Sequence, residues 1–478
     1  MKALLINPPA PEGVRMVREG RCMQREGAWG ATWPPISLAY IAAVLEKENF
    51  ECRLHDCIVE NINLEKLKDI SKEFEPNIIF INTATPSIDF DIQAAESLKQ
   101  ENSSVKIILF GIHVTALAEE ILKVHPLIDF LILGEPEIPA KEIALAIKEN
   151  KNNYSDISGI AFKENNQIIQ TQQKPIQNLD ELPYPAWNLI KTNLYITPLV
   201  NRPFLMIATN RGCPHNCTYC ADHVYYGKKL RYRDPKKIAE EMIWIKNTFK
   251  VYDFLFWSEG FTMNKDYAKK VCKAIIDTKE KFSFVCNGRI GDVDEELANL
   301  LKQAGCWMIG YGIESGVQEI LNNVRKNITL QQTIETIKIT KKAKIKVTGH
   351  FILGLPGDTK ETIQQTIKFA KKLKIDYAQF YCSVPFPGSE LYLDAKSKGY
   401  ITNSDWKYFE QNYSILDYPN LKPDEVMKLR KKAYTSFYFR PSIFLSNVFS
   451  LRNFGQLKNL TKVGVSFLDW AKRQSIKP

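Results

Sequence analysis

Three cysteines lie in one short stretch, with three residues between the first two and two residues between the second pair: Cys213, Cys217 and Cys220. Thiolates this close in sequence can converge on one metal centre. Zinc usually takes four ligands and favours C-x2-C pairs, and no fourth Cys or His completes a local tetrahedron, although His215 and His223 lie near. An iron–sulfur cube held by three thiolates instead keeps one iron open. The spacing therefore favours such a cluster over zinc or over three unrelated core cysteines.

The cysteine loop follows a predicted buried strand, Phe204–Thr209, and has an aromatic residue, Tyr219, just before its last cysteine. With these features it resembles the signature loop of the radical S-adenosylmethionine (SAM) superfamily. The resemblance implies a [4Fe-4S] cluster on Cys213, Cys217 and Cys220, with SAM chelating the open iron. It also implies an external electron donor and cleavage of SAM to a 5′-deoxyadenosyl radical.

Three later segments resemble further SAM-binding motifs of this superfamily and occur in the same order. They are residues 256–262, where Ser258 replaces the first member of an acidic pair, and residues 310–316 and 349–358. The match covers residue 204 to about residue 395 and includes Pro385-Phe386-Pro387-Gly388 near its end. The SAM contacts that the resemblance implies are Tyr219, Glu259, Glu314, His350 and Gly354.

The N-terminal segment resembles the cobalamin-binding domain that precedes the radical SAM core in a large subgroup. The matching pieces are residues 33–40, 83–87, 111–115 and 134–135. The cobalamin contacts implied by this resemblance are Thr83, Ser87, Gly111, His113, Thr115, Gly134 and Glu135. The alternative is a cofactor-free domain of the same fold.

One classical cobalamin motif is altered in this chain. Classical domains carry Asp-x-His-x-x-Gly, whose histidine ligates cobalt from below, but residues 56–61 have Ile58 in place of the histidine and Asn61 in place of the glycine. We therefore expect cobalamin to bind without that axial imidazole. His55 is adjacent, but strand alternation should turn it toward the other face of the sheet.

Alternating strand and helix signals position these residues. In residues 1–150 the alternation predicts a doubly wound, parallel (Rossmann-like) α/β domain with its ligand at the carboxyl ends of the strands. The predicted strands are Ala3–Ile6, Glu51–His55, Ile78–Asn82, Lys106–Phe110 and Asp129–Leu133. Residues 151–200, with a hairpin over Ile157–Thr171, are predicted to be a linker.

Residues 201–395 repeat the alternation six times, which predicts an open (β/α)6 barrel with its chemistry at the carboxyl ends of the strands. The predicted strands are Phe204–Thr209, Asp253–Trp257, Phe282–Asn287, Trp307–Gly312, Val347–Leu353 and Tyr377–Ser383. Residues 396–478 are predicted to be a basic C-terminal helical region.

Length and composition exclude several classes of protein. The 478 residues are 45% hydrophobic and 25% charged, which is typical of a folded chain of about three domains and not of a disordered one. No apolar run reaches the ~18 residues of a membrane span, and the first strand is too short for a secretion signal. We therefore expect a cytoplasmic protein without a disulfide framework. The other seven cysteines are expected to pack in the core, with Cys382, near the end of the sixth barrel strand, as the candidate for facing the active site.

The excess charge is concentrated at the C-terminus. Residues 422–478 contain twelve Lys or Arg and three acids, a net +9 of the chain's +10, together with an aromatic and apolar run over 437–449. We expect this tail to bind an anionic membrane surface, which would make the protein peripheral at the inner face of the membrane. The alternatives are a helical cap over the barrel and nucleic-acid binding, for which no recognisable module is present.

These features predict a cobalamin-dependent radical SAM methyltransferase that acts on an unactivated carbon of a hydrophobic or lipidic small molecule. The sequence also resembles the anaerobic magnesium-protoporphyrin monomethyl ester cyclase, which would make the enzyme a cyclase or oxidase. A non-catalytic cobalamin or iron–sulfur sensor would not need the SAM-side motifs together. Methylthiolation of RNA would require further cluster cysteines, and Cys22, Cys52 and Cys57 do not form such a set. The sequence does not identify the substrate.

Overall fold

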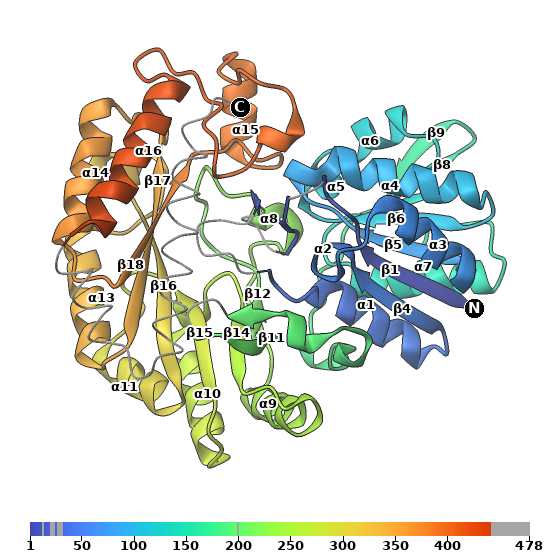
Figure 1. Ribbon diagram of the computed structural model, residues 1–478, viewed down its shortest axis with the longest axis horizontal. Coiled ribbons are helices and arrows are strands. Elements are labelled where there is room, and N and C mark those ends of the chain that lie inside the picture. Colours follow the sequence, from blue (N-terminus) through green and yellow to red (C-terminus); the bar gives the residue numbers. More distant parts are fainter. Residues whose placement is uncertain (12–13, 20–23, 26–31, 198–199, 441–478) are drawn as a thin grey trace.

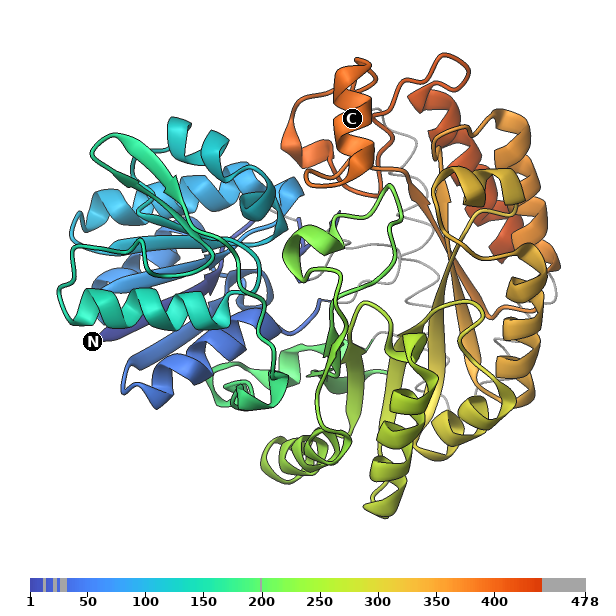
Figure 2. The same cartoon turned by 180° about the vertical axis from the view of Figure 1, so that it is seen from behind.

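The computed structural model of the protein describes residues 1–11, 14–19, 24–25, 32–197 and 200–440. Figure 1 shows an N-terminal lobe in blue to blue-green and a C-terminal lobe in green to red. The short helix α8 (Asp222–Tyr225) lies between the two lobes, and Figure 2 shows the same arrangement from behind.

The N-terminal lobe is built on a seven-stranded sheet of order β4-β1-β5-β6-β7-β8-β9. Its strands are β1 (Lys2–Asn7), β4 (Glu51–Asp56), β5 (Ile78–Asn82), β6 (Lys106–Phe110), β7 (Phe130–Ile132), β8 (Ile160–Glu164) and β9 (Gln167–Gln170). The first five in this order pair in parallel, and β8 and β9 add an antiparallel hairpin. Strand β5 is buried along its whole length, because helices cover both faces of a parallel sheet. These helices are α1 (Ile36–Lys47), α3 (Leu64–Phe74), α4 (Ile88–Glu101), α5 (Ile112–Ala116), α6 (Ala118–Val124) and α7 (Glu137–Lys148).

The C-terminal lobe contains six parallel strands that curve into a half-barrel, with the helices on its outer face (Figure 1). The strands are β11 (Arg202–Ala208), β14 (Asp253–Trp257), β15 (Ser283–Gly288), β16 (Cys306–Glu314), β17 (Lys346–Leu353) and β18 (Tyr377–Cys382), and β10 (Ile196–Thr197) pairs antiparallel with β11. The helices are α9 (Pro235–Phe249), α10 (Lys265–Asp277), α11 (Glu295–Gln303), α12 (Gln318–Asn323), α13 (Leu330–Lys342), α14 (Lys360–Lys372), α15 (Glu390–Ser397) and α16 (Pro423–Tyr438). The α/β fold class predicted from the sequence is confirmed.

Each of the eleven predicted strands is present, with ends that differ by at most two residues. The hairpin predicted over 157–171 also forms. It is not an isolated linker element, because β8 pairs with β7 and so extends the N-terminal sheet. Hydrophobic periodicity locates strands well but does not show which edge a hairpin joins.

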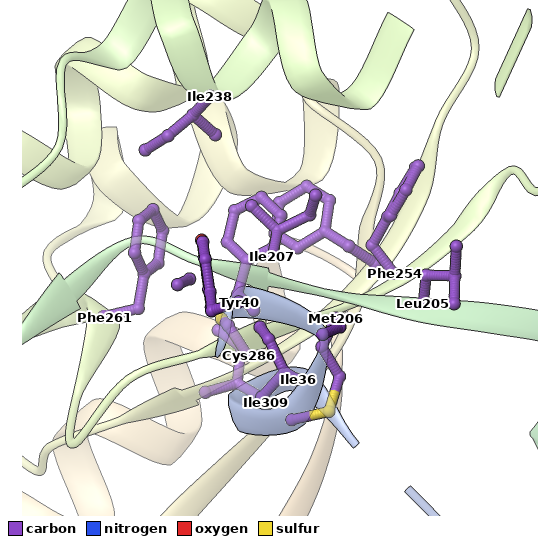
Figure 3. Close-up of a cluster of buried hydrophobic side chains, with 14 of the residues drawn as sticks. Ile36, Tyr40, Leu205, Met206, Ile207, Ile238, Phe254, Phe261, Cys286 and Ile309 are labelled. Atoms are coloured by element: carbon purple, nitrogen blue, oxygen red, sulfur yellow. The ribbon is translucent and has the colours of Figure 1, made fainter. Parts of the chain in front are cut away.

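A continuous apolar core joins the two lobes. It contains Ile36 and Tyr40 from α1 and Met206 and Ile207 from β11, all buried. Figure 3 shows these side chains together with buried residues of the half-barrel. The shared core means that the lobes form one packed unit, which fixes the strand ends of one lobe relative to those of the other.

Helix α16 packs along the last strand of the half-barrel and bonds to its backbone. The Tyr438 hydroxyl accepts from Ala378 N at 3.0 Å and donates to Ala378 O at 2.7 Å. The Tyr434 hydroxyl accepts from Phe380 N at 3.1 Å, and Arg430 Nε donates to Phe380 O at 2.7 Å. These contacts make α16 an integral part of the C-terminal lobe.

The C-terminal region is less helical than the sequence pattern predicts. Between α15 and α16, residues 398–422 form turns, a 3-10 turn over Trp406–Tyr408 and isolated β-bridges. Their apolar residues, such as Ile415 and Leu421, fill gaps over the lobe instead of lining one helix face. Residues 441–478, the larger part of the predicted membrane-binding tail, lie outside the described residues.

Candidate active site

A cavity of about 450 Å³ runs along the inner face of the half-barrel. The six parallel strands of the half-barrel all contribute to its wall, and Val17 and Trp33 of the N-terminal lobe help to close it. Trp33 meets Trp257 of β14 edge-to-face, with ring centroids 5.5 Å apart. The cavity therefore lies where the two lobes meet, along the inside of the parallel strands.

The three cysteines of the loop after β11 all line this cavity, so the structure brings them together at one end of the barrel. None is in a disulfide, and each is partly exposed. Among the described residues no group of three or more His, Cys, Asp or Glu side chains is arranged to hold a single metal ion. A cube of four irons binds each cysteine to a different iron and so spaces the thiolates farther apart than one ion does.

A buried ion pair lies beside the cysteine loop. Lys326 Nζ is 2.6 Å from Glu314 Oε1 and 3.4 Å from the Tyr219 hydroxyl, and all three residues line the cavity. Burial, and then the neighbouring Glu314 carboxylate, raises the pKa of the Tyr219 hydroxyl well above its usual range. Burial, and then the cations of Arg289 and Lys326, lowers the pKa of His215 to about 4, so this imidazole is neutral at pH 7. The predicted SAM contacts Tyr219 and Glu314 therefore lie in one electropositive corner.

Glycines in β16 make room for these groups. A Cβ on Gly312 would overlap Glu314 Oε1 and would lie 2.9 Å from Lys326 Nζ. A Cβ on Gly310 would lie 2.8 Å from His350 Nε2. Glu314 itself has a φ of +64° at a register shift between β16 and β17. A non-glycine residue in this region is strained, and such strain is frequent at functional sites.

Of the other predicted site residues of this lobe, some line the cavity and one does not. Glu259 and His350 line the cavity, and His350 Nδ1 is 3.3 Å from the Tyr381 hydroxyl. Gly354 does not line it, because it forms a turn after β17 with a φ of +80° whose open side faces Val426. Cys382 lines the cavity, but burial raises the pKa of its thiol to about 11 and the thiol contacts Met427 Sδ at 3.6 Å. Cys382 is therefore a protonated wall residue.

In the N-terminal lobe, the seven residues predicted to contact cobalamin gather at the carboxyl ends of β5, β6 and β7. None of the seven lines the cavity described above. Thr83 Oγ1 donates to Phe110 O at 2.8 Å, Ser87 Oγ donates to Asp91 Oδ2 at 2.6 Å, and Thr115 Oγ1 accepts from Gly134 N at 3.0 Å.

The same strand ends also hold unsatisfied polar atoms. Thr85 Oγ1 and His113 Nδ1 are buried and have no hydrogen-bond partner among the described residues. Burial lowers the pKa of His113 to about 3, and its ring lies edge-to-face on Trp406 at 4.6 Å. Buried polar groups are normally hydrogen-bonded, so these strand ends fit a polar ligand.

We expect Gly111→Ala to destabilise the N-terminal lobe by about 2–4 kcal/mol, because strain and overpacking act together. Gly111 has a φ of +136°, and a Cβ there would overlap the Thr83 carbonyl oxygen. Gly399→Ala is the matched control, since Gly399 has a φ of +67° but no atom within 4 Å of the added Cβ. It should lose only about 1 kcal/mol. Urea unfolding followed by circular dichroism measures both, and equal losses would contradict the overlap.

The side chain of His55 contacts a carboxylate and is not positioned as a free ligand for cobalt. Its Nδ1 lies 3.2 Å from Glu60 Oε1, and Lys191 holds the other oxygen of Glu60 at 2.9 Å. We therefore expect the Co(II) form of bound cobalamin to show no nitrogen superhyperfine splitting in its electron paramagnetic resonance spectrum. The His55→Ala variant should give the same spectrum, and a splitting that disappears in this variant would show the opposite.

A buried ionic network connects the lobes directly in front of the cysteine loop. Arg211 Nη1 lies 3.1 Å from Glu135 Oε2 and 3.1 Å from Glu137 Oε2, and Arg211 Nη2 also pairs with Glu137. Arg231 Nη2 lies 2.5 Å from Glu135 Oε1. Glu135, predicted to contact cobalamin, is therefore a partner of these two arginines.

Sequence reasoning missed Arg211 and Lys326 as site residues. Both belong to short segments whose hydrophobic pattern predicts neither a helix or strand nor a functional role. A basic residue two positions before the first cysteine was the available signal for Arg211, but its acidic partners are 74 and 76 residues away in the chain.

Comparison with known proteins agrees with this architecture. The sequence model of the radical SAM superfamily matches residues 207–370, and that of the B12 binding domain matches residues 27–144. An uncharacterized methyltransferase of Pyrococcus horikoshii is 32% identical over 95% of this chain and 96% of its own length. The chain therefore belongs to the radical SAM superfamily, and to those of its members that carry an N-terminal cobalamin-binding domain.

Two further similarities extend the comparison. The anaerobic magnesium-protoporphyrin IX monomethyl ester cyclase of Cereibacter sphaeroides is 26% identical over 86% of this chain and 68% of its own length. The structure of the radical SAM methyltransferase TsrM from Kitasatospora setae, with cobalamin and a [4Fe-4S] cluster bound, superposes with a TM-score of 0.68 at 17% identity. That superposition covers 83% of this chain and 78% of TsrM, and it shows a shared fold.

The cofactors of this protein are accordingly a [4Fe-4S] cluster, SAM and cobalamin. The residues present fit them. Three free thiols face one cavity and offer the donor set of a cluster with an open iron. The strand ends of the N-terminal lobe hold two buried polar atoms, Thr85 Oγ1 and His113 Nδ1, that have no hydrogen-bond partner among the described residues and could bond to a polar cofactor.

Proposed function

We propose that the protein is a cobalamin-dependent radical SAM methyltransferase that adds a methyl group to an unactivated carbon of a small, largely apolar substrate. The observation that supports it is a single cavity lined by the three cysteines, by Glu259 and Glu314, and by Trp33 of the N-terminal lobe. Substrate in this cavity would lie next to the cysteine loop and against Trp33 of the N-terminal lobe. The methyltransferase of Pyrococcus horikoshii, similar over nearly its whole length, supports the same reaction class.

The bound cofactors supply a hydrogen-abstracting radical and a transferable methyl group, and the chain supplies position and shelter. Cys213, Cys217 and Cys220 would hold the cluster. Lys326 and Glu314, paired at 2.6 Å, give SAM a charged corner whose side chains are fixed before binding. The tryptophans that line the cavity, Trp33, Trp257 and Trp307, would exclude water and so protect a reactive intermediate from side reactions.

The test is anaerobic turnover. Reconstituted enzyme is mixed with SAM, methylcobalamin, a one-electron reductant and cell extract, and products are compared by mass spectrometry with a reaction that lacks SAM. We expect a compound whose mass increases by that of one CH2 group. When the methyl groups of the donors are labelled with deuterium, the product should carry the deuterium. SAM cleavage without any methylated product would contradict the proposal.

The second candidate reaction is cyclisation or oxidation, which is favoured by the similarity to the Cereibacter sphaeroides cyclase over 86% of this chain. The same experiment separates the two reactions. An oxidised or cyclised product loses hydrogen or gains oxygen and carries no labelled methyl group.

We further propose that the C-terminal tail brings the enzyme to an anionic membrane surface. Within the described residues no helix is long and apolar enough to cross a membrane. Helix α16 is packed into the lobe and its Arg430 is buried, although Lys428, Lys431 and Lys432 are exposed, so the proposal assigns the membrane contact chiefly to residues 441–478. These residues carry six Lys or Arg and one acid.

We expect the full chain to pellet with vesicles that contain anionic lipid, and to pellet less at high salt, because surface attraction is screened. A chain that ends at Arg440 keeps α16 and should stay in the supernatant. Vesicles of neutral lipid are the control. Equal sedimentation of the two chains with anionic vesicles would remove the membrane assignment.

A further inference from the structure

Two buried polar side chains, Ser383 and Gln411, line the cavity near the end of β18. Ser383 is 3% exposed and Gln411 is 7% exposed, and both line the cavity wall. Ser383 Oγ and Gln411 Oε1 have no hydrogen-bond partner among the described residues. Leaving a buried polar atom unpaired is unfavourable, so two such atoms on one cavity wall indicate that a ligand completes them.

The backbone around both residues is held in place. Ser383 N donates to Leu353 O at 2.8 Å, and Cys382 N donates to Gln411 O at 2.9 Å. The neighbouring Asn412 is held through its side chain by Arg430 Nη2 at 2.7 Å. The two side chains are therefore presented from a fixed frame, which lowers the entropy that binding a ligand would cost.

Residues of opposite charge type lie near the pair. Burial raises the pKa of the Cys382 thiol beside Ser383 to about 11, and Arg430 and Glu410 act on this pKa in opposite directions. A hydroxyl and a carboxamide recognise neutral groups that both donate and accept hydrogen bonds. An ionised group would be left without a counter-charge, which disfavours it in a buried site.

Large apolar side chains line the cavity from the earlier strands of the half-barrel. Phe204, Leu255, Trp257, Trp307 and Met308 line it from β11, β14 and β16. By contrast, β18 presents Gln379 and Tyr381 on the same side as Ser383, as the alternation of a strand requires. The cavity therefore has an aromatic side and a side of neutral polar groups.

The pair also lies near the junction of the lobes. Val384 and Phe386, which follow Ser383, belong to one buried cluster with Ala221 of the cysteine loop. Ala84 and Ile112, from the strand ends of the N-terminal lobe, belong to the same cluster. A ligand bonded to Ser383 would be held next to both cofactor regions.

We propose that Ser383 and Gln411 form the hydrogen-bonding subsite that anchors the substrate through an uncharged hydroxyl or amide group, while the ring or hydrocarbon part of the substrate lies against the aromatic wall. This rests on the proposed function, because it takes the cavity to be the substrate site. It also adds one neutral polar group to the largely apolar substrate, which makes the substrate amphipathic.

The test uses a matched pair of probes and no turnover. 2-Naphthylacetamide carries a bicyclic ring and an amide, and 2-isobutylnaphthalene has the same shape without the polar atoms. Their binding to the reconstituted holoenzyme with SAM is measured by anaerobic calorimetry. We expect the amide to bind about tenfold tighter, because the hydrocarbon leaves both protein groups unpaired.

In Ser383→Ala/Gln411→Leu this preference should fall below about twofold, and each single variant should lose part of it. Ser397→Ala/Gln364→Leu makes the same chemical changes on exposed helix positions and should keep the full preference. Iron content and circular dichroism show whether each variant is folded. If the double variant does not fold, the single variants give the answer.

Two results would overturn the subsite: no preference for the amide in the native protein, or an unchanged preference in the folded variants. These results are independent of the reaction. A preference that depends on Ser383 and Gln411 together with a failed methyl-transfer assay would retain the subsite and reject the proposed reaction. Methyl transfer by a protein that shows no preference for the amide would support the proposed reaction and reject the subsite.

Discussion

The variant in which Cys213, Cys217 and Cys220 are all replaced by alanine should contain no iron–sulfur cluster and should not cleave SAM. Three thiols in one loop line the cavity, and no other described group of His, Cys, Asp or Glu is arranged to hold a metal in their place. Thiolates are the ligands of such clusters, so the loss should be complete rather than graded. Iron analysis, visible absorbance and 5′-deoxyadenosine release measure the two effects.

A matched control removes three other thiols. Cys52, Cys57 and Cys272 are buried, and burial raises the pKa of each thiol. Their combined replacement by alanine should lower stability but should leave the iron content unchanged. If the loop variant still bound four irons per chain and cleaved SAM, the cluster assignment would be wrong.

Replacing Arg211 by methionine should lower the free energy of unfolding by about 3–5 kcal/mol, because it leaves the buried Glu137 carboxylate without its cation. The Glu135 and Glu137 side chains are 3% and 1% exposed, so water cannot replace the lost partner. Glu135 keeps Arg231, whereas Glu137 loses both of its bonds to Arg211. The change in the free energy of unfolding is measured by urea unfolding of the apoprotein, monitored by circular dichroism.

Two further variants make this test specific. Lys342 and Glu295 form an ion pair with side chains that are 69% and 60% exposed, and Lys342→Met should lower the free energy of unfolding by less than about 1 kcal/mol. Adding Glu137→Gln to Arg211→Met removes the unpaired charge and should restore part of the loss. A loss for Arg211→Met no larger than for Lys342→Met would show that the network does not stabilise the contact between the lobes.

Local patterns predicted the strands because burial of parallel strands is visible along the chain. Ile78–Asn82 has four apolar residues before its final asparagine, and its prediction as a strand is confirmed without any shift of its ends. The cysteine loop is equally local, since its three thiols lie within eight residues of sequence. Features of this kind need no knowledge of which distant segments meet.

The parts that sequence reasoning missed depend on distant contacts. Arg211 pairs with Glu137 across 74 residues, and Lys326 meets Tyr219 across 107 residues. The turn at Gly354 likewise faces Val426 of α16, 72 residues later in the chain. A single sequence contains no signal for such pairs, because their spacing is set by the fold and not by a repeat.

The side chains of α16 that bond to β18 have a consequence for how the molecule behaves at high concentration. A half-barrel ends in an edge strand, whose unpaired backbone groups are a template for pairing with another chain. Arg430 and Tyr434 both bond to the backbone of Phe380, and Tyr438 bonds to that of Ala378. Tyr434 and Tyr438 are four residues apart, a rise of about 6 Å in a helix. The two strand residues that they cover are two apart, about 6.6 Å in a strand, so the spacing of the helix matches that of the strand. The helix takes the place of a further strand beside β18, and this edge of the open sheet is protected against edge-to-edge aggregation without closure into a full barrel.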